Sequence, residues 1–448
     1  MNQQIIIVLD CGATNVRAAA INEKGIIIAL QSYPNNTQAD PHYKAGLIWN
    51  VDEIWAKLLE ATKKVLSDIR KEDIAGITVT SFGVDGAPMK RNGELLYPVI
   101  SWACQRTAPI MENIDRYIPL EDLYRISGIN KFNFNTINKL IWLKENRPEI
   151  LERMDHFVFM PSILIHKLSG EFITDTSMAG TSMMTDIKSR NFSNEIIDAL
   201  GIEKKFPPLA EAGEVIGKIH PHASDETGLP VGTPVIATGH DTQFAVYGSG
   251  AKEKEAVLSS GTWEILMART TQIRTNNELL NQGVTIEFDA LPGMYNPGLQ
   301  WLGSGILEKI KHTFYKKESS QSGIYELMIK EAENAEAANI RINLDALNEN
   351  DIFPEPVMNV RREQIYRAAL EALAKKTRQS LRILEKAGDF KAESIVIVGG
   401  GSKNRLWNQL REKELGIPVK IIEQTESTVI GAAQIAFMGL LNQENAGF

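Results

Sequence analysis

Residues 5–21 read IIIVLDCGATNVRAAAI, and this stretch sets the expected fold. The continuous apolar run at its start is typical of a buried strand. A second apolar run ends the stretch, and after a turn at Gly25, which can supply a positive φ, residues 26–30 form a third. The pattern predicts three successive strands joined as hairpins, with a small acidic loop at the first corner.

The loop at this first corner has the composition of a phosphate-binding loop. Gly12 and Ala13 lack bulk, so backbone N–H groups can approach an anion, and Thr14 and Asn15 add short donors. Asp10 would repel a bare phosphate, so this interpretation requires a cation between the two. The alternative is a tight turn that binds nothing.

A similar pattern recurs at the start of the second half of the chain. Residues 256–258 and 263–267 predict two strands, and the Ser-Ser-Gly-Thr loop between them contains Gly261 and Thr262. Strand, small polar loop and strand therefore occur once in each half. We interpret the repeat as two related domains that face one nucleotide, with the boundary near residues 248–254.

The sequence Gly-His-Asp-Thr-Gln at residues 239–243 supplies the candidate base. It follows a β-rich apolar run at 234–237 and precedes residues 244–247, which can be helical. An acid on such a strand-to-helix turn can point into a cleft, so we interpret Asp241 as the group that takes the proton from a sugar hydroxyl. The alternative is that Asp241 only caps the helix.

Two segments of the first half are candidates for contacts with a sugar. Residues 81–86, Ser-Phe-Gly-Val-Asp-Gly, follow a predicted strand, and ligands of α/β sheets bind at strand ends. Asp85 can there accept hydrogen bonds from sugar hydroxyls; the alternative is an ordinary turn residue. Residues 95–102 are strand-like, and Trp102 with Arg106 fits a sugar face and a pair of hydroxyls. The alternative for this pair is a core tryptophan with a surface arginine.

A glycine-rich segment lies near the C-terminal end of the sequence, after a predicted strand at 394–398. Residues 399–404 read Gly-Gly-Gly-Ser-Lys-Asn. Three glycines between a strand and a helix let a flat or anionic ligand reach the backbone, and the helix N-terminus favours negative groups. The alternative is a plain tight turn, for which one glycine would suffice.

Long amphipathic helices are expected at 51–69 and 361–386.

Composition excludes several classes of protein. The 448 residues predict two or three domains, and 48 basic against 56 acidic residues give a net charge of −8, which disfavours nucleic acid and membrane surfaces as partners. Cys11 and Cys104 are the two cysteines, which fits a reducing cytosol better than a disulfide scaffold. Residues 1–4 have no basic region of a signal peptide, and no apolar run approaches the ~18 residues of a membrane helix. We therefore expect a cytoplasmic protein.

Taken together, these segments resemble the FGGY carbohydrate kinases, a branch of the actin, hexokinase and Hsp70 ATPase superfamily. The resemblance covers nearly the whole chain. Residues 9–17 resemble the family's first phosphate loop and 259–263 the second, 398–404 resemble the adenosine loop, and 239–241 resemble the segment that holds the catalytic base. The chain has no Gly-x-x-x-x-Gly-Lys-Ser/Thr motif, which disfavours a P-loop kinase.

The resemblance implies an α/β fold with two ribonuclease H-like domains, of the actin and hexokinase type, around an interdomain ATP cleft. Residues 1–247 would form the sugar-binding domain with the catalytic base, and 248–448 the nucleotide-binding domain. Closure of the two domains would exclude water and limit wasteful ATP hydrolysis. A monomer or a homodimer is expected.

Within the family, three segments are similar to the L-fuculokinase type: 82–86, 100–107 and 240–244. Rhamnulokinases share Gly-Val-Asp and His-Asp-Thr. Two positions depart from the pattern of many relatives. Ala13 stands where many carry Thr, and Cys104 stands where xylulokinase-like members often have Asp, which argues against a xylulose-type pocket.

The implied activity is phosphorylation of a ketose hydroxyl by ATP with Mg²⁺, with L-fuculose expected as the sugar and L-fuculose 1-phosphate as the product. Asp241 would be the catalytic base, and Asp10 and Asp241 would bracket Mg²⁺. The residues implied for ATP and its phosphates are Asp10, Gly12, Ala13, Thr14, Asn15, Arg17, Gly261, Thr262, Gln300, Gly399, Gly400, Gly401 and Asn404. The residues implied for the sugar are Gly83, Asp85, Trp102, Arg106, His240, Thr242 and Asn296.

Three alternatives stay open at this point. The chain could be a rhamnulokinase or another ketose kinase of the family. It could be an actin-like ATPase switch, which would keep the phosphate and adenosine loops but would not need Asp85 or the pair of Trp102 and Arg106. It could be a sugar-binding regulator, which would be expected to carry an added DNA-binding module.

Overall fold

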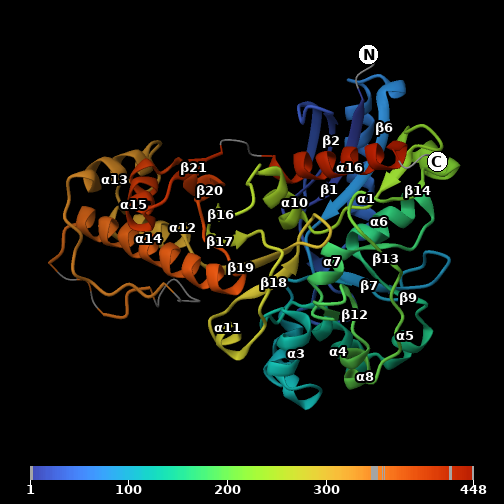
Figure 1. Ribbon diagram of the computed structural model, residues 1–448, viewed down its shortest axis with the longest axis horizontal. Helices are drawn as coiled ribbons and strands as arrows, with labels where there is room; N and C mark the ends of the chain where they lie inside the picture. Colours follow the sequence, from blue (N-terminus) through green and yellow to red (C-terminus); the bar gives the residue numbers. More distant parts are fainter. Residues whose placement is uncertain (1–3, 345–351, 356, 358, 423–425, 446–448) are drawn as a thin grey trace.

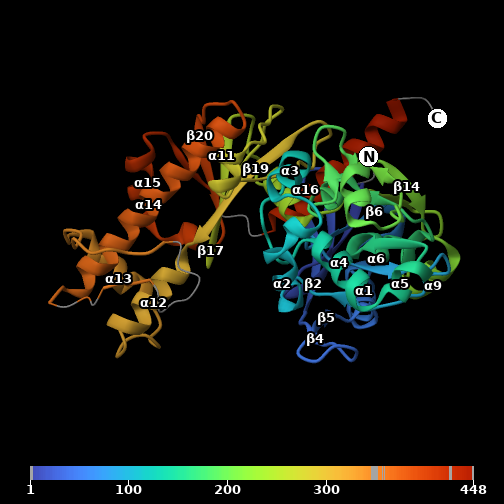
Figure 2. The same cartoon turned by 90° about the horizontal axis from the view of Figure 1, so that it is seen from below.

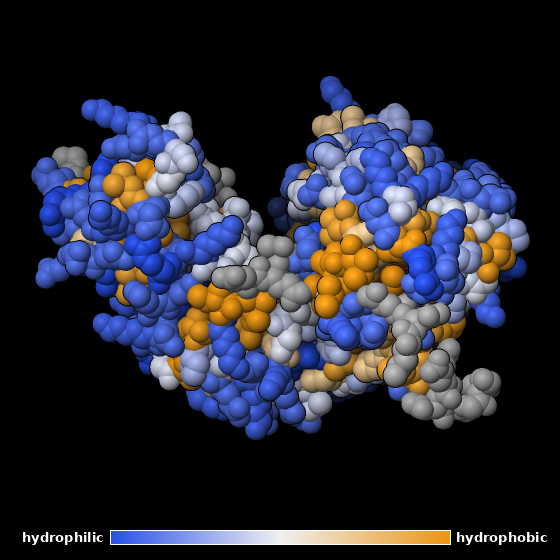
Figure 3. Space-filling view, turned by 90° about the horizontal axis from the view of Figure 1, so that it is seen from above, coloured by the Kyte–Doolittle hydropathy of each residue, from blue (hydrophilic) through white to orange (hydrophobic). Residues whose placement is uncertain are grey.

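The computed structural model describes residues 4–344, 352–355, 357, 359–422 and 426–445. The expected absence of a signal peptide concerns residues 1–4, of which only residue 4 is described. Two lobes lie side by side, one formed mainly by the first half of the chain and the other by the second (Figure 1). A hollow separates the lobes on the face that Figure 3 shows.

A six-stranded sheet forms the centre of the N-terminal lobe. The predicted meander is confirmed as β1 (Ile5–Cys11), β2 (Asn15–Asn22) and β3 (Ile27–Pro34), which pair antiparallel. On its other side β1 pairs in parallel with β6, and β6 pairs in parallel with β15. The remaining strands of this sheet are β6 (Ile74–Ser81), β15 (Pro234–Ile236) and, antiparallel at the edge, β14 (Val215–Lys218).

The sheet of the C-terminal lobe repeats this pattern. Its hairpin is β16 (Glu255–Ser260) and β17 (Trp263–Ala268), and β17 pairs antiparallel with β19 (Tyr295–Leu302). Next to β16 lies β20 (Ser394–Val398), and next to β20 lies β21 (Val419–Ile421); both pairs are parallel. In each lobe three antiparallel strands are therefore followed by two parallel ones, which confirms the internal repeat that the sequence predicts. The edge strand is β18 (Thr285–Phe288), antiparallel to β19.

Helices cover both sheets. The predicted helix at 51–69 is α1 (Val51–Leu66), which buries Ile54, Leu58 and Val65 and is capped by Asn50, whose side chain accepts from Glu53 N. The helix predicted at 361–386 is α14 (Arg362–Ala387). The helices of the N-terminal lobe are α2 (Ala108–Glu112), α3 (Leu120–Ser127), α4 (Thr136–Asn146), α5 (Pro148–Arg153), α6 (Met160–Ser169), α7 (Thr176–Gly180), α8 (Asn194–Leu200) and α9 (Pro221–Thr227). The further helices of the C-terminal lobe are α11 (Asn277–Asn281), α12 (Ser304–Phe314), α13 (Ile324–Glu333) and α15 (Arg405–Leu415).

Short strand pairs connect these elements. The strand expected at 95–102 is mostly wrong: only β8 (Val99–Ile100) forms, because Pro98 has no N–H to donate to a ladder. One small sheet has three strands, β4 (Gln38–Ala39), β5 (Leu47–Trp49) and β8. The strand pairs are β7 (Gly86–Met89) and β9 (His156–Phe159); β10 (Thr174–Asp175) and β13 (Leu209–Ala210); and β11 (Thr185–Asp186) and β12 (Asn191–Phe192).

Two helices cross between the lobes at very short range. They are α10 (Asp241–Gly248) and α16 (Ser427–Asn445). A Cβ atom on Gly248 would lie 1.9 Å from the carbonyl oxygen of Ser427, and one on Gly431 would lie 2.0 Å from that of Phe244. Only glycine fits both positions, so these residues let the two backbones touch.

The last helix returns to the first lobe. Although α16 belongs to the second half of the chain, it lies across β1 and β6, as Figures 1 and 2 show. Its Val429 and Ile430 share one buried cluster with Ile6 and Val8 of β1. In the described part of the chain, no helix combines the length and apolar character that crossing a membrane requires.

Candidate active site between the lobes

A cavity of 990 Å³ is lined by both lobes. Three of its lining residues are Ala13 of the first phosphate loop, Asp241 at the start of α10, and Gln300 of β19. The other predicted site residues that line it are Gly83, Trp102, His240 and Thr242. The structure thus brings seven residues predicted from separate segments to one cavity.

Asp241 is the first residue of α10, and His240 is the N-cap. Its Oδ1 accepts hydrogen bonds from the backbone N of Thr242 at 2.6 Å and from the Thr242 hydroxyl at 3.2 Å. Burial raises the pKa of Asp241 to about 6, the negative charge of Asp10 adds to this effect, and His240 opposes it. Asp241 therefore helps to satisfy the helix terminus and also has the raised proton affinity of a candidate base.

Asp10 is buried at the end of β1. Its Oδ1 accepts a hydrogen bond from the Thr80 hydroxyl at 2.9 Å, and its Oδ2 pairs with Arg17 Nε at 2.6 Å. Arg17 also pairs with Glu426, the residue before α16. The guanidinium is thus held by two carboxylates, and its predicted contact with phosphate stays a prediction.

The first phosphate loop is fixed by its own backbone. Gly12 N donates to Asn15 O at 2.9 Å, and a Cβ on Gly12 would lie 2.9 Å from that same oxygen. Asn35 donates from its side chain to Gly12 O at 2.9 Å and from its backbone to Thr14 O at 2.8 Å. The side chains of Thr14 and Asn15 are exposed, and the Asn15 amide donates to the Thr14 hydroxyl at 3.2 Å.

The second phosphate loop rests on a buried ion pair. Its carbonyls at Gly261 and Thr262 accept from the backbone that starts α12. Beneath the loop, Glu264 pairs with Arg411 of α15 at 2.7 Å and accepts from the Ser260 hydroxyl at 2.5 Å. Burial raises the pKa of Glu264 above its usual value, because Arg411 only partly offsets the loss of water. The pair links this loop to the helix that follows the third glycine-rich segment.

The three glycines after β20 have different surroundings. A Cβ on Gly399 would lie 2.7 Å from Ser260 O, and one on Gly401 would lie 2.1 Å from Ser260 Oγ. Gly400 has no described atom within 4 Å of that position. Packing against the second phosphate loop therefore accounts for Gly399 and Gly401, whereas Gly400 leaves an open stretch of backbone. Asn404 caps α15 by accepting from Trp407 N at 3.1 Å.

Gly83 lets one wall of the cavity approach the turn that carries Asp241 closely. A Cβ on Gly83 would lie 3.0 Å from His240 Nε2 and 3.0 Å from Thr181 Cγ2. His240 Nδ1 lies 3.0 Å from Glu287 Oε2, and its Nε2 lies 3.5 Å from Asp241 Oδ1. Burial alone would lower the pKa of His240, but the two carboxylates outweigh it and raise this pKa above its usual value.

Asp85 and Arg106 lie behind the cavity wall. The Asp85 carboxylate is fully buried and accepts from Trp49 Nε1 at 2.6 Å and from Trp102 N at 3.0 Å, and it pairs with Lys139. Arg106 is an equally buried partner of Asp40 at 2.6 Å, whereas the Trp102 side chain is 39% exposed. The alternative of a core tryptophan with a surface arginine is therefore wrong for both residues, because the tryptophan is exposed and the arginine is buried.

Asn296 is also buried, and its amide donates to the Gln243 side chain. In this geometry Asp85, Arg106 and Asn296 fix the wall instead of presenting polar atoms to the cavity. Their direct contact with a sugar stays a prediction.

Several residues that line or support the cavity lie outside the sequence motifs and were not predicted. Glu287, Phe132 and Phe134 line the cavity, and the two phenylalanine rings stack with centroids 5.0 Å apart. Asp175 caps α7, and the hydroxyl of Ser177 accepts from His240 N at 3.1 Å. The residues around position 175 form a short polar run without a motif, and the contact of Ser177 with His240 joins positions that are remote in sequence.

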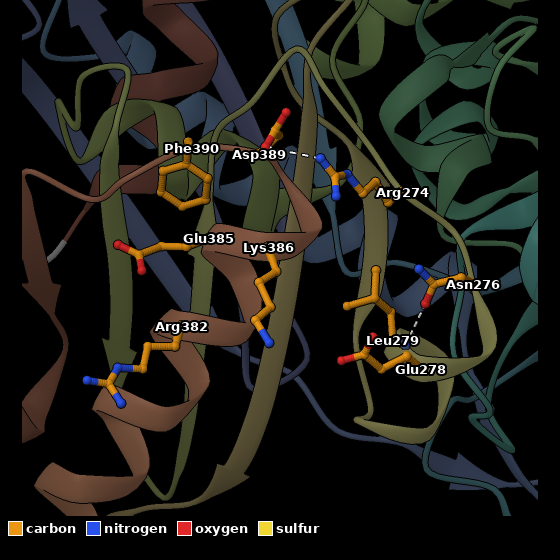
Figure 4. Close-up of a pocket in the computed structure, with 9 residues that line it drawn as sticks. All are labelled: Arg274, Asn276, Glu278, Leu279, Arg382, Glu385, Lys386, Asp389 and Phe390. Atoms are coloured by element: carbon orange, nitrogen blue, oxygen red, sulfur yellow. Dashed lines mark hydrogen bonds and ion pairs between the residues drawn. The ribbon is translucent and has the colours of Figure 1, made fainter.

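A second hollow of 760 Å³ lies between α11 and the end of α14 (Figure 4). There Arg274 pairs with Asp389 at 3.1 Å, and Asn276 accepts from Leu279 N at 3.0 Å. The residues that line it are Arg274, Asn276, Glu278, Leu279, Arg382, Glu385, Lys386, Asp389 and Phe390. Cations and carboxylates alternate here, and the predicted phosphate loops lie elsewhere, so the interlobe cavity is the candidate active site.

Comparison with known proteins gives matches over nearly the whole chain. Residues 5–248 match the profile of the FGGY family of carbohydrate kinases, N-terminal domain, and residues 256–440 match that of its C-terminal domain. The L-fuculokinase of Escherichia coli strain K12 is 46% identical over 98% of this chain and 93% of that protein. The rhamnulokinase of Bacteroides thetaiotaomicron is 28% identical over 97% of this chain and 91% of its own length.

Among solved structures, the xylulose kinase from Rhodospirillum rubrum superposes with a TM-score of 0.88. The match covers 97% of this chain and 90% of that chain at 19% sequence identity. At this identity the likeness shows the fold alone, which is the two-domain α/β fold of the actin and hexokinase type.

Proposed function

The chain belongs to the FGGY family of carbohydrate kinases, and we propose that it transfers the terminal phosphate of ATP to the 1-hydroxyl of L-fuculose. An ATP-dependent sugar kinase activity follows from the family. The choice of sugar rests on one observation: the L-fuculokinase is 46% identical to this chain, whereas the rhamnulokinase is 28% identical over a similar length.

The two lobes have different roles in this proposal. We assign the sugar and the catalytic base to residues 1–247, and the nucleotide to residues 248–448. Gly83, Trp102 and His240 support the first assignment, because all three line the cavity beside Asp241. The open backbone at Gly400 supports the second.

Asp241 acts as the base in this proposal. Phosphoryl transfer depends mainly on positioning and on stabilisation of charge. Asp241 orients the attacking hydroxyl and accepts its proton late, when the oxygen has become acidic enough. Its raised pKa of about 6 supports this role, because a carboxylate with higher proton affinity is a better acceptor.

Backbone amides of both phosphate loops hold the transferred group from opposite lobes. The loop at Gly12 supplies N–H groups from the N-terminal lobe, and the loop at Gly261 supplies them from the C-terminal lobe. Rigid support beneath each loop, from Asn35 and from Glu264 with Arg411, supports this assignment. Preorganised donors of this kind need no rearrangement during the reaction.

Asp10 and Asp241 are the residues that fit Mg²⁺. Their mutual repulsion, which contributes to the raised pKa of Asp241, would be relieved by a cation between them. The described residues contain no cluster of three or more metal-ligating side chains, but Mg²⁺ needs only one or two carboxylates besides phosphate and water. When bound, the ion would neutralise charge on the phosphates.

The test is a panel of ketoses with ADP release as the readout. L-fuculose, L-rhamnulose and further ketoses are each supplied with MgATP, and kcat/KM is measured for each. L-fuculose is expected to give the highest value. Preference for L-rhamnulose would contradict the proposed substrate, turnover independent of sugar would indicate an ATPase switch, and no turnover would indicate a binding protein.

A further inference from the structure

Glu287 reaches the catalytic turn from the opposite lobe. It lies on β18, the edge strand of the C-terminal sheet, and its side chain lines the cavity at 15% exposure. Its Oε2 lies 3.0 Å from His240 Nδ1 and 2.5 Å from Gln243 Nε2. Both partners belong to the turn that carries Asp241, so one carboxylate from the C-terminal lobe holds two side chains of the N-terminal lobe.

The contact determines which nitrogen of His240 faces the cavity. An ionised carboxylate only accepts hydrogen bonds, so Nδ1 carries the hydrogen that it shares with Glu287. This holds for the neutral and for the protonated ring alike. The other nitrogen, Nε2, is then directed to Asp241 Oδ1, 3.5 Å away, and to the wall at Gly83.

A second bond across the lobes supports the same arrangement. Because the Gln243 amide nitrogen binds Glu287, its Oε1 accepts from Asn296 on β19. The strand that bears Glu287 is itself held against the N-terminal lobe, since Ile286 N donates to Gly128 O at 2.8 Å. Glu287 is thus placed by main-chain pairing and not by a flexible loop.

From these contacts we propose that Glu287 is a positioning residue for the kinase reaction, which fixes the His240 ring so that Nε2 faces the sugar hydroxyl and Asp241. The proposal rests on the proposed sugar kinase function. It follows that the sugar site is complete only when the lobes are close enough for Glu287 to reach His240. This makes the C-terminal lobe a participant in sugar binding as well as in ATP binding.

Two substitutions of similar size in the full-length chain separate hydrogen bonding from packing. Glu287→Gln keeps an oxygen that accepts from Nδ1, whereas Glu287→Met keeps the volume and removes the acceptor. With L-fuculose and saturating MgATP, Glu287→Met is expected to lose about 10–100-fold in kcat/KM for the sugar, the size of loss seen when the partner that orients a metal-binding histidine is removed. Glu287→Gln is expected to stay close to wild type, and KM for ATP is expected to be unchanged in both.

A spectroscopic readout makes the test independent of turnover. Long-range ¹H–¹⁵N spectra of the histidine side chains are expected to show His240 protonated at Nδ1 in the wild type and in Glu287→Gln, and altered in Glu287→Met. Glu278→Met, which removes an exposed carboxylate of α11, is the matched control and should change neither spectrum nor rate.

Wild-type kinetics in Glu287→Met would overturn the proposal. So would an equal loss in Glu287→Gln and Glu287→Met, since charge and not hydrogen bonding would then matter. A wild-type enzyme that phosphorylates no ketose would contradict the proposed function, while the His240 spectra would still report whether Glu287 holds the ring.

Discussion

Asp241 combines two tasks at one position, since it satisfies an amide of its own helix and faces the cavity. Asp241→Asn keeps the shape and most hydrogen bonds but removes the proton acceptor. We expect turnover to fall by ~10²–10⁴-fold, the typical contribution of a positioned base. Steady-state ADP release measures it.

The control for this change is Asp198→Asn, which alters an exposed carboxylate of α8. It should leave turnover unchanged, and circular dichroism should show both variants folded. Wild-type turnover in Asp241→Asn would remove Asp241 from the mechanism.

Asp175 predicts a dependence of stability on pH. Burial raises the pKa of Asp175 to about 6, although bonds from Ser177 and Met178 oppose this effect. Between about pH 4 and pH 6 the unfolded chain has lost this proton while the folded protein still binds it, so unfolding becomes easier as pH rises. As pH rises through this range, the wild-type protein should lose up to about 3 kcal/mol of unfolding free energy that Asp175→Asn, whose side chain cannot titrate, does not lose.

Urea unfolding at pH 4.5, 5.5 and 6.5 checks this difference between the two proteins. If the difference in unfolding free energy stayed constant across this range, the raised pKa would be wrong.

Local residues were easier to predict than their partners. Gly12, Gly261 and Asp241 could be placed correctly on two hairpin turns and at a helix start, because turns and strand ends have a signal within a few residues. The burial of Arg106 could not, since it depends on Asp40 and on rings that come from other segments. Glu287 carries no motif at all, and its role follows only from a contact with a residue 47 positions away.

The crossing of α10 and α16 predicts a strong sensitivity to one methyl group. Gly431→Ala places a Cβ 2.0 Å from Phe244 O, so the helices must separate. Overpacking of this kind typically costs about 1–3 kcal/mol, and we expect a loss of about 2 kcal/mol or more even after the helix-propensity gain of alanine. Urea unfolding monitored by tryptophan fluorescence measures it, and unchanged stability would contradict the close approach.

Gly400→Ala makes the same change as Gly431→Ala, but at a position with open space around the added methyl group. No described atom lies within 4 Å of the added methyl group, and φ at this position is not positive, so stability should stay at the wild-type value. If the adenosine moiety packs on this backbone, KM for ATP should rise about tenfold, equivalent to about 1.4 kcal/mol. An unchanged KM for ATP would place the nucleotide elsewhere.

At the scale of elements, the repeat of strand, small loop and strand predicted one hairpin in each sheet, because each hairpin is local in sequence. The path of α16 was not predictable in this way. Residues 427–445 are rich in apolar side chains, which suits a packed helix, but nothing in them shows which of the two sheets they cover.

The whole molecule is expected to unfold in one step, although it has two lobes. The helix α16 packs into the core of the first lobe, and Tyr124 and Ile187 of the first lobe belong to the buried cluster of the second, so we expect the two lobes to lose their packing together. Differential scanning calorimetry of the ligand-free protein should show one transition, with equal calorimetric and van't Hoff enthalpies. Two resolved transitions would show that α16 couples the lobes weakly.

The return of α16 to the first sheet also affects how the protein is made on the ribosome. The strands of that sheet are complete by Ile236, yet the helix that covers one face is synthesised about 200 residues later. At translation rates of roughly 5–20 residues per second, Ile6 and Val8 therefore remain uncovered by α16 for about 10–40 s after Ile236 has been synthesised. During that interval the nascent chain presents an apolar surface, to which chaperones that bind hydrophobic segments are expected to attach.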